Sequence, residues 1–582
     1  MDKKSLMAIG LVTIVILLLP SYYSLIYDEP APQTISGSQD PSANHLKETY
    51  VAPEPKEAET EKALPKETKK AELSDIRSIQ SSIKGTDQLI TIEIETPLVT
   101  TKISNQGGGN FESWYLKKYD TWHSTPAQII EPSLKNGVET TFVTAKGEKI
   151  NLNDFRFRMV DEPRGKIILN AEESKTFHYE LEIDGHLIRK ELTVYGNKYH
   201  ADFKVNIANA KELLLNTEYD ISWINGLPSN EKNISEEYTY SESYARMGGE
   251  LESFSLDSED PVKDVPMNGT AEWVGTRTKY FLAAIIPVGT NTVGAVFGGS
   301  GVKVGEVIER RYHTSLINSF SDNDIDDSFR IYMGPMDYSV LSEYNNGLDE
   351  LIMNHGWYER AFRPISLLIL KVFKFFQLFI PNYGIVIIIF SVLVKILVYP
   401  LTKKSYKSMK EMGKVQPLMA EIKEKYKKDP QRMNKETMKL YKEHGINPMG
   451  GCLPMLLQLP LLGALFIVFR STIQLRGASF IPGWINDLSS ADTIFTLPFS
   501  LPMYGDQFNI LPILMAVSMI FQSKMTMQDP KQKAMVYIMP IFMLLIFNQF
   551  PSGLNLYYTL FNVLTIIQQK ITDGDPKAIK NK

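Results

Sequence analysis

An almost uninterrupted apolar stretch, YGIVIIIFSVLVKILVYPLT at residues 383–402, constrains this chain more than any other segment. At a rise of about 1.5 Å per residue, a helix of this length crosses a hydrocarbon layer of about 30 Å. Lys395 lies well inside the stretch, where a lysine costs roughly 2.5–3.5 kcal/mol and usually faces a protein interior or a wet cavity. Alternatively, its long side chain could snorkel toward the basic residues that follow Pro400. The stretch therefore predicts a transmembrane helix and leaves both interpretations of Lys395 open.

Composition and charge narrow the class of protein. The chain has 582 residues, enough for several domains, and a net charge of −5. That charge excludes a generally basic protein that coats nucleic acid, although acidic residues concentrate before residue 350 and lysines after residue 400. Cys452 is the single cysteine, so no intramolecular disulfide can form. The eight histidines are scattered without metal-ligand spacing, and we predict neither a metal site nor a cofactor.

The first 84 residues divide into two segments. Lys3 and Lys4 precede an apolar run over residues 6–26, and no small-residue cleavage site follows it. We therefore predict a signal-anchor transmembrane helix over residues 1–27 with a cytoplasmic N-terminus; a cleaved signal peptide is the alternative. Residues 28–84 are rich in Pro, Glu, Lys, Ser and Thr. Because such a segment cannot bury enough apolar surface to offset its chain entropy, we predict a disordered periplasmic linker.

From residue 85 to residue 345 the period of the apolar residues changes to two. The alternation is clearest in four runs that are rich in β-branched and aromatic side chains: 89–96, 177–184, 190–196 and 199–208. Gly196 and Asn197 join the last two of these runs and predict a hairpin turn. Many short strands separated by turn signals favour an extracytoplasmic antiparallel β-sandwich domain.

Glycines and tryptophans of this region admit both a functional and a structural interpretation. The Gly-rich stretches 105–110 and 297–305 lack the spacing of phosphate-binding loops, and we predict that both are turns between strands. Four tryptophans could line a sugar- or peptide-binding groove, but core packing is the stronger prediction for each: Trp114, Trp122, Trp223 and Trp273.

A second apolar stretch, residues 363–380, carries a polar stripe. Lys371, Lys374 and Gln377 recur every third residue, and Pro381 ends the stretch early. A helix with this pattern tends to lie in the membrane interface. Counting it as a span would also place the most basic loop of the chain outside the cell membrane. We therefore predict an interfacial amphipathic helix.

That basic loop, residues 403–447, contains 13 basic and 6 acidic side chains, a net charge of +7. Its pattern predicts two short helices, EMGKVQPLMAEIKEKY and KETMKLYKEHGI, with a turn at Lys428-Asp429-Pro430. The charge places this helical hairpin in the cytoplasm under the positive-inside rule. A surface that captures nascent chains, anionic lipid or a partner is a further interpretation.

Four more apolar segments within 450–571 predict transmembrane helices three to six, at about 450–469, 509–527, 533–549 and 552–571. Acidic residues outnumber basic ones in the connection 470–508, which we place outside, whereas lysines mark the connection before residue 534 and the short tail 572–582 as cytoplasmic. The expected fold class is thus a polytopic α-helical membrane protein with six transmembrane helices and an extracytoplasmic β-sandwich.

Few polar residues lie within the last five predicted spans. Ser391 precedes Lys395 by one turn, so the two share a helix face. Gln458 and Gln522 interrupt other spans. In the last span a polar seam recurs at helical spacing: Asn555, Tyr558, Asn562 and Thr565. A seam alone indicates either hydrogen bonds between helices or a hydrated groove, and together with Lys395 it favours the groove.

A groove with one fixed positive charge fits two functions. It could assist the movement of a flexible polymer into the bilayer, or it could hold the substrate of a small-solute transporter with Lys395 as counter-ion. Paired discontinuous helices or an internal repeat would favour the transporter, and neither is visible in the sequence. A third alternative is a glycan-binding or enzymatic β-domain on a membrane anchor, which deletion of most of 85–345 would test.

Three blocks of sequence resemble the YidC family of membrane protein insertases, whose members extend to mitochondrial and chloroplast inner membranes: VYPLTKKSYKSMKEM (398–412), LYKEHGINPMGGCLPMLLQLP (440–460) and FPSGLNLYYTLFNVLTIIQQ (550–569). The resemblance covers roughly residues 360–570, and by position and pattern the β-domain looks like the periplasmic domain of the Gram-negative members. It implies five core helices around a hydrophilic groove that opens to the cytoplasm and to lipid.

The resemblance implies a non-enzymatic insertase and chaperone of the bacterial inner membrane. Nascent membrane proteins would be its substrates, Sec translocon components its partners, and a ribosome or targeting receptor would dock at the 403–447 hairpin; direct nucleic-acid binding is not expected. Most bacterial members carry an arginine where this chain has Lys395, and lysine keeps the charge but loses the bidentate fork. The groove residues would be Lys395, Ser391, Gln458, Gln522, Asn555, Tyr558 and Asn562.

Overall fold

The computed structural model describes residues 81–161, 165–256, 262–304, 307–445, 453–526 and 534–573. The predicted signal anchor (1–27) and nearly all of the predicted linker (28–84) lie outside the described residues, as do Cys452 and most of the predicted tail (572–582). Residues 75–582 form one compact unit, which contains every element below.

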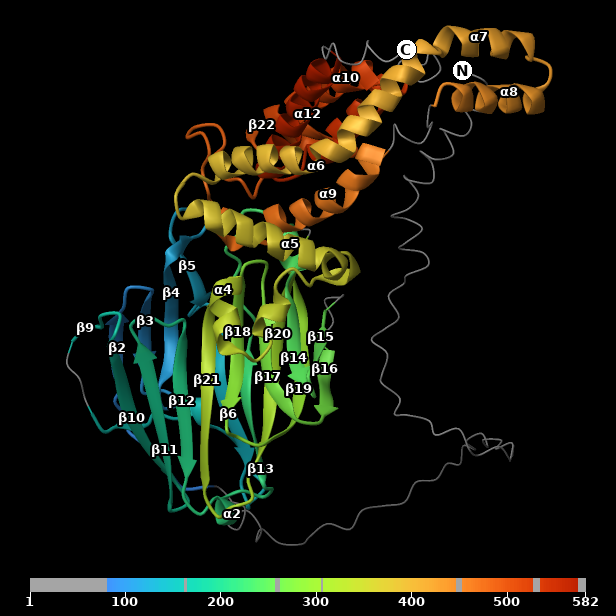
Figure 1. Ribbon diagram of the computed structural model, residues 1–582. Coiled ribbons are helices and arrows are strands. Elements are labelled where there is room, and N and C mark those ends of the chain that lie inside the picture. The colour runs from blue at the N-terminus through green and yellow to red at the C-terminus, as the bar shows by residue number, and fades with distance from the viewer. Residues whose placement is uncertain are drawn as a thin grey trace, which may run out of the picture. The chain divides into compact units, whose positions relative to one another are not determined.

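The region after the predicted linker is built from sheets, as its period-two pattern predicts (Figure 1). Among the described residues, the largest sheet has the order β1 (Ile83–Lys84), β10 (Ser174–Ile183), β11 (His186–Tyr195), β12 (His200–Ile207), β21 (Ile325–Pro335), β18 (Phe281–Val288), β17 (Ala271–Arg277), β14 (Glu242–Met247) and β15 (Glu250–Phe254), with β8 (Arg158–Met159) beside β10. The second has the order β16 (Val262–Asn268), β19 (Thr292–Val304), β20 (Val307–Ser319), β13 (Glu218–Ile224), β6 (Gly137–Val143) and β7 (Lys149–Asn151). The third has the order β5 (Pro126–Ile130), β4 (Asn110–Asp120), β3 (Val99–Ser104), β2 (Thr91–Glu95) and β9 (Ile167–Ile168).

Alternating burial explains why these runs form strands. In β10, Phe177, Tyr179, Leu181 and Ile183 are buried while the residues between them are more exposed, so one face of the strand lies on the core. Strands β17 and β18 of the first sheet contact β20, β19 and β13 of the second, which places the two sheets face to face. The described pairs are antiparallel except β2 with β9, which is parallel. We refer to this region as the β-domain.

The predicted hairpin turn is confirmed. Strand β11 ends at Tyr195, β12 begins at His200, and the two pair antiparallel with Val194 opposite Ala201. The Gly-rich stretch 105–110 is likewise the turn between β3 and β4. Three of the four tryptophans, Trp114, Trp223 and Trp273, are fully buried in the core as predicted, whereas Trp122 is exposed.

The prediction for the second Gly-rich stretch is wrong. Residues 297–304 lie inside β19 and pair with β20 rather than forming a turn. A Cβ atom on Gly298 would lie 2.2 Å from Cε1 of His313 on the neighbouring strand. Glycine at this position therefore makes room for a side chain across the sheet, which a local pattern cannot indicate.

Helices make up most of the chain after the β-domain: α5 (Gly356–Gln377), α6 (Tyr383–Lys414), α7 (Gln416–Lys425), α8 (Pro430–Glu443), α9 (Leu453–Ser471), α10 (Ile510–Thr526), α11 (Met535–Phe547) and α12 (Ser552–Asp573). Helix α12 contacts α6 and α10, α10 contacts α11, and α5 contacts α9. A hairpin of β22 (Thr493–Leu501) and β23 (Gly505–Asn509) connects α9 to α10. Short helices α2 (Ala210–Leu213), α3 (Ile234–Thr239) and α4 (Tyr338–Leu341) belong to the β-domain.

Among the described residues, the segment Tyr383–Pro400 of α6 is the one that is long and apolar enough to cross a bilayer by length and composition alone. The apolar segments Gln458–Ser471, Ile510–Met525 and Met535–Phe547 are shorter. Helices α6, α9, α10, α11 and α12 thus coincide with the second to sixth predicted spans, whereas the first predicted span lies outside the described residues.

Two helix boundaries differ from the expectation. Helix α6 continues through Pro400 to Lys414, so the first part of the predicted loop belongs to it, because no glycine interrupts the strong helix formers before Gly413. Helix α5 begins at Gly356, ahead of the predicted start at residue 363.

The predicted helical hairpin of the basic loop is present as α7 and α8. The Asp429 carboxylate accepts a hydrogen bond from the backbone N–H of Arg432 at 3.1 Å, and Pro430 occupies the first turn of α8. Val415, Met419 and Leu440 pack together between the helices. The turn therefore lies where the Lys-Asp-Pro sequence predicts it.

Candidate functional site

Lys395 is buried between α6 and α12. Its Nζ donates a hydrogen bond to Oγ1 of Thr565 at 2.7 Å and lies 4.5 Å from the centroid of the Phe561 ring. Only 7% of the residue is exposed. The ammonium group is thus held against a second helix by a hydroxyl and an aromatic face, which is an environment that stabilises a cation away from water. This contact brings together two residues that are 170 positions apart in the sequence.

Residues of the polar seam of α12 form hydrogen bonds to two other helices, α10 and α6. Asn562 Nδ2 donates to Ser518 Oγ of α10 at 3.0 Å, and Gln568 Nε2 donates to Thr402 Oγ1 of α6 at 2.9 Å. Since these two contacts lie on either side of Thr565 along α12, the seam and Lys395 form one continuous polar strip. We call this strip, defined by Lys395, Ser518, Asn562, Thr565 and Gln568, the intramembrane polar site.

Asn555 has a different environment from the rest of the seam. Its Nδ2 donates to the backbone oxygens of Phe547 at 3.1 Å and Phe550 at 3.2 Å, at the end of α11. These bonds tie the first turn of α12 to the last residue of α11 and to the connection that follows it. The contacts of Asn555 are therefore those of a link between two helices, and its predicted role in a groove stays a prediction.

The other predicted residues surround the site less closely. Ser391 is buried one turn before Lys395, and its hydroxyl donates to the backbone oxygen of Ile387 at 2.7 Å. Tyr558 packs edge-on against Phe547, with 5.6 Å between the ring centroids. Gln458 lies in α9 and Gln522 in α10, and both are half-buried.

Sequence reasoning missed four residues that the structure brings to Lys395 and the seam: Phe561, Ser518, Thr402 and Gln568. Gln568 continues the helical spacing of the seam by three residues beyond Thr565, so extending the pattern would have found it. Ser518 is a single polar residue within the apolar sequence MAVSMIF, which is the same signal that identified Gln458. Phe561 could not be distinguished from ordinary apolar packing.

The electrostatic character of the site is positive. The sequences of α9, α10, α11 and the first 21 residues of α12 contain no Asp or Glu, nor does residue range 383–402 of α6. A cation in such surroundings attracts negative charge more strongly than it would in water, because the local dielectric constant is low. Together with hydroxyl and amide groups, it can bind an acidic or polar segment of a flexible chain.

A second polar cluster joins the end of α9 to the β-domain. Arg470 Nε lies 2.8 Å from Glu236 Oε1, and Arg476 Nε lies 2.6 Å from Glu231 Oε1. Burial opposes ionisation of Glu236, but Lys279 and Arg470 outweigh it and lower the pKa of that carboxyl. Tyr280 also donates its hydroxyl to the backbone oxygen of Arg470 at 3.0 Å. This cluster ties the first residues after α9 to α3 and its neighbours.

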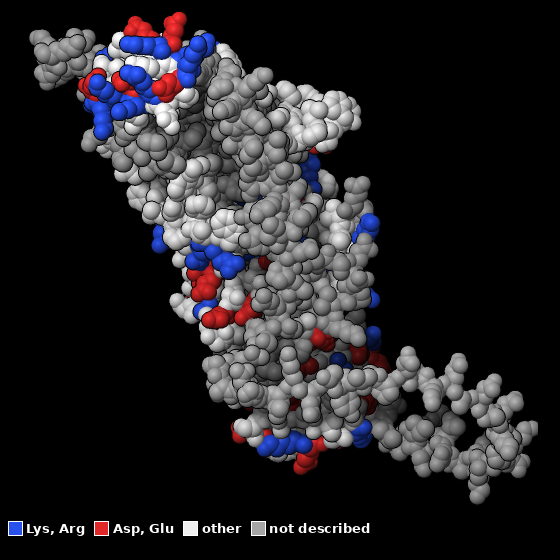
Figure 2. All heavy atoms as spheres, turned by 90° about the vertical axis from the view of Figure 1, so that its right-hand side faces the viewer, with Lys and Arg blue, Asp and Glu red and all other residues white. Residues whose placement is uncertain are grey.

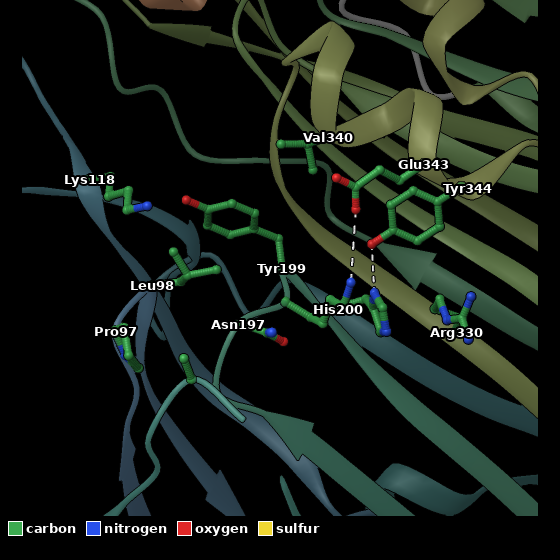
Figure 3. Close-up of a pocket in the computed structure, with 12 residues that line it drawn as sticks. Pro97, Leu98, Lys118, Asn197, Tyr199, His200, Arg330, Val340, Glu343 and Tyr344 are labelled. Atoms are coloured by element: carbon green, nitrogen blue, oxygen red, sulfur yellow. Dashed lines mark hydrogen bonds and ion pairs between the residues drawn. The ribbon is translucent and has the colours of Figure 1, made fainter. Parts of the chain in front are cut away.

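The β-domain has a pocket of about 510 Å³ beside β12 and α4 (Figure 3). His200 Nδ1 shares a hydrogen bond of 2.6 Å with the Tyr344 hydroxyl, and burial lowers the pKa of His200 to about 4. The histidine is therefore neutral at pH 7. Two cations of the pocket are paired with acids, Arg330 with Asp202 and Lys198 with Glu343. The pocket lies in the β-domain and none of its lining residues belongs to the polar site, so we assign no ligand to it.

Comparisons with known proteins match two families to successive parts of the chain, and the boundary between the two matches lies within α5. Residues 91–368 match the family described as the YidC periplasmic domain, and residues 375–578 match the family described as the 60Kd inner membrane protein. A relative from Chlorobaculum parvum, named membrane protein insertase YidC, is 34% identical over 592 aligned positions, covering 99% of this chain and 96% of the relative. One of the same name from Prosthecochloris aestuarii is 38% identical and covers 83% of this chain and 82% of its own length. A crystal structure described as active YidC insertase is 19% identical over 85% of this chain and 94% of that one, with a TM-score of 0.34.

Proposed function

This chain belongs to the YidC family of membrane protein insertases, and from that premise we propose that the intramembrane polar site is where it engages its substrates. Insertion of nascent proteins into the inner membrane is the activity of the family, and the periplasmic domain is part of this chain. The observation that carries the proposal is the buried contact of Lys395 with Thr565 and Phe561, which holds a cation within the membrane-length segment Tyr383–Pro400.

The proposed topology has six spans, with both termini in the cytoplasm and residues 85–345 in the periplasm. The charges of the connections support it under the positive-inside rule, because this topology places the +7 loop 403–447 in the cytoplasm and the acidic connection 470–508 in the periplasm. The 13 residues of α11 extend only about 20 Å, which is less than a typical hydrocarbon core. A bilayer next to such a short helix becomes thinner, and this shortens the path of a polar segment.

The proposed mechanism is non-enzymatic and uses attraction rather than a chemical step. A hydrophilic, acidic part of an incoming chain is drawn toward Lys395 while its apolar part leaves sideways into lipid. Ser391, Gln458, Gln522, Tyr558 and Asn562 offer hydrogen bonds along the way, and Asn555 holds the turn between α11 and α12 in place. Lysine meets the requirement for charge, although it lacks the paired donors of arginine.

The α7–α8 hairpin is the proposed site of first contact with substrates. Figure 2 shows Lys and Arg side chains interspersed with Asp and Glu over this hairpin. Such a surface attracts anionic lipid, acidic segments of nascent chains, or a ribosome or targeting receptor. Cooperation with the Sec translocon belongs to the same proposal. The small-solute transporter is not favoured, because relatives over nearly the whole chain are named insertases.

Site-specific photo-crosslinking tests the proposed site. A photoreactive residue at Asn562 should crosslink to an arrested nascent membrane protein, because this side chain belongs to the polar strip. Val563 and Ile567 of the same helix are 42% and 48% exposed, and they serve as matched controls. Crosslinks to substrate from the two controls but not from position 562 would contradict the proposal.

A further inference from the structure

The hairpin of β22 and β23 exposes an unusual amount of apolar surface. Thirteen consecutive residues, 493–505, carry no charged side chain. Five large apolar side chains of this segment are between 42% and 58% exposed: Ile494, Phe495, Phe499, Leu501 and Met503. An isolated two-stranded hairpin is marginally stable in water, and an exposed apolar patch of this kind marks a contact surface. The segment must therefore be held in place by other contacts, and its apolar side chains must pack against another surface.

Polar bonds at its base provide the support. The Asp492 carboxylate accepts hydrogen bonds from the backbone N–H groups of Ile510 at 3.0 Å and Leu511 at 2.8 Å, at the start of α10. Asn548, at the end of α11, donates through Nδ2 to the backbone oxygens of Tyr504 and Gln507, both at 2.8 Å. The hairpin is thus fixed to two helix ends by buried polar groups, and its apolar side chains are not used to hold it there.

The two sides of β22 differ in how apolar they are. Because successive residues of a strand point to opposite sides, Phe495, Leu497, Phe499 and Leu501 fall in one row, and the other row mixes apolar with polar residues: Ile494, Thr496, Pro498 and Ser500. Phe508 of β23 pairs with Phe495 and stacks on it, with 4.8 Å between the ring centroids, and the pairing shifts register between Thr496 and Leu501. The row of Phe and Leu side chains is therefore the more apolar side of β22.

We propose that this apolar row rests on the outer leaflet of the bilayer, at the boundary between headgroups and acyl chains. The inference rests on the proposed topology, in which the connection 470–508 lies outside. Strand β23 ends at Asn509 and α10 begins at Ile510, and α10 also exposes apolar side chains, Leu514, Val517 and Phe521, which the proposed topology places against the acyl chains. In Figure 1, β22 lies at the level of the helices and not among the sheets of the β-domain.

Lipid fits this surface better than a protein partner does. The row contains only Phe and Leu, and the segment offers no charge with which a partner could be selected. Docking of this kind depends on apolar burial, so it should not require anionic lipid. The consequence for the protein is that the Asn548 bonds transmit the position of the leaflet surface to the turn between α11 and α12. The hairpin thereby sets the depth of the outer ends of α11 and α12, and α12 carries three residues of the polar site.

Depth-dependent quenching tests this inference. The full chain carrying Cys452→Ser, with either Phe499→Cys or Ser500→Cys, is labelled with an environment-sensitive fluorophore and reconstituted into phosphatidylcholine vesicles, with or without phosphatidylglycerol. We expect lipid-borne quenchers placed near the headgroups to quench the label at position 499 about twofold or more strongly than the label at position 500, at both lipid compositions. Equal quenching of both labels by aqueous iodide would overturn the proposal.

Two controls separate this result from failure of the proposed function. If labelling of Ser500→Cys from the periplasmic side of spheroplasts fails, the topology itself is wrong. If that labelling succeeds and insertion activity is retained, but the label at position 499 is not quenched by lipid, the docking inference alone is wrong. Quenching that disappears when the protein is diluted in lipid would identify a second copy of the chain as the occupant and would also overturn the proposal.

Discussion

Three lysines are buried among the described residues, and two of them, Lys190 in the β-domain and Lys395 between the helices, have similar contacts, whereas Lys279 forms an ion pair with Glu236. Lys190 is 1% exposed and Lys395 is 7% exposed. Each donates to a threonine hydroxyl, Lys190 to Thr140 at 3.2 Å and Lys395 to Thr565 at 2.7 Å. Each also lies over a phenylalanine ring. By their local contacts alone, the two residues would be assigned the same role.

The two lysines differ in the structural elements that they connect. Lys190, on β11, also donates to the backbone oxygen of Gly107 at 2.8 Å, in the turn between β3 and β4, while Thr140 belongs to β6. It therefore links all three sheets of the β-domain at one point. Lys395 instead joins two helices along a strip of hydroxyl and amide groups. A buried lysine thus indicates function only where its neighbours form a polar path; where they form a closed junction of sheets, it indicates stability.

The largest effect should follow from reversing the charge at the structural lysine. Lys190→Glu places a carboxylate against the Gly107 carbonyl and should lower the free energy of unfolding of the β-domain by about 3–5 kcal/mol. Lys190→Met, the matched control, should cost about 1–3 kcal/mol, because it leaves acceptors without a donor but buries no charge. Denaturation of the full chain, followed by fluorescence of the buried tryptophans, measures both. Wild-type stability in Lys190→Glu would contradict the assignment.

The same lysine predicts a pH dependence of stability. Burial lowers the pKa of Lys190 to about 7, below the 10.5 of the unfolded chain. Between these values the unfolded state binds more protons than the folded state, so stability should rise with pH from about 7 to 10, by up to about 1.4 kcal/mol per unit, and stay flat below 7. The difference in free energy of unfolding between wild type and Lys190→Met at pH 7, 8 and 9 isolates this effect. A difference that does not change with pH would show that Lys190 keeps an ordinary pKa.

The two threonines allow a matched test of the comparison. Thr140→Val should lower the stability of the β-domain by about 1 kcal/mol and leave the insertion rate unchanged. Thr565→Val should lower stability by only about 0.6 kcal/mol but reduce the insertion rate several-fold, because it removes the hydroxyl that holds the Lys395 ammonium. Insertion into proteoliposomes and denaturation are measured on both variants. A reduced insertion rate in Thr140→Val together with a normal insertion rate in Thr565→Val would contradict the assignment of Lys190 to stability and of Lys395 to insertion.

The smallest expected effects distinguish residues within the seam. Asn555→Ala removes the hydrogen bonds that tie α12 to the end of α11 and should cost about 0.5–1.5 kcal/mol of stability per bond without a specific loss of insertion by the folded protein. Asn562→Ala should be nearly neutral for stability and should reduce insertion about twofold. The insertion rate of each variant is divided by its amount of folded protein, and the two values are compared. Equal insertion by both variants would remove Asn562 from the polar site.

The sequence predicted those features that depend on local periodicity. Alternation indicated the strands of the β-domain, and the Lys-Asp-Pro turn located the α7–α8 hairpin. Lys190 could also have been recognised, because it occupies the same inward phase of β11 as Ile188, Leu192 and Val194. The apolar context of Lys395 was sufficient to identify that residue as a candidate.

The remainder depends on partners that are distant in the chain. The local sequence around Gly298 indicates a turn, and only the position of His313 on the neighbouring strand explains why a glycine lies within the sheet. Asn555 shares the spacing of Asn562, yet one side chain bonds to the end of α11 and the other bonds to Ser518 of α10. Helical spacing identifies which residues share a face, but not which neighbour that face meets. The division of the seam between structure and function could therefore not be predicted from the sequence.

The most direct test of the account is insertion of a small, acidic-tailed single-span protein into proteoliposomes that contain wild type, Lys395→Arg, Lys395→Gln or Lys395→Glu. We predict that Arg retains activity, because the charge is kept, and that Gln and Glu reduce the rate by about tenfold or more, which corresponds to about 1.4 kcal/mol of lost attraction. Denaturation measured in parallel shows whether each variant is folded. Equal insertion by all four proteins would contradict the central claim that the charge of Lys395 drives insertion.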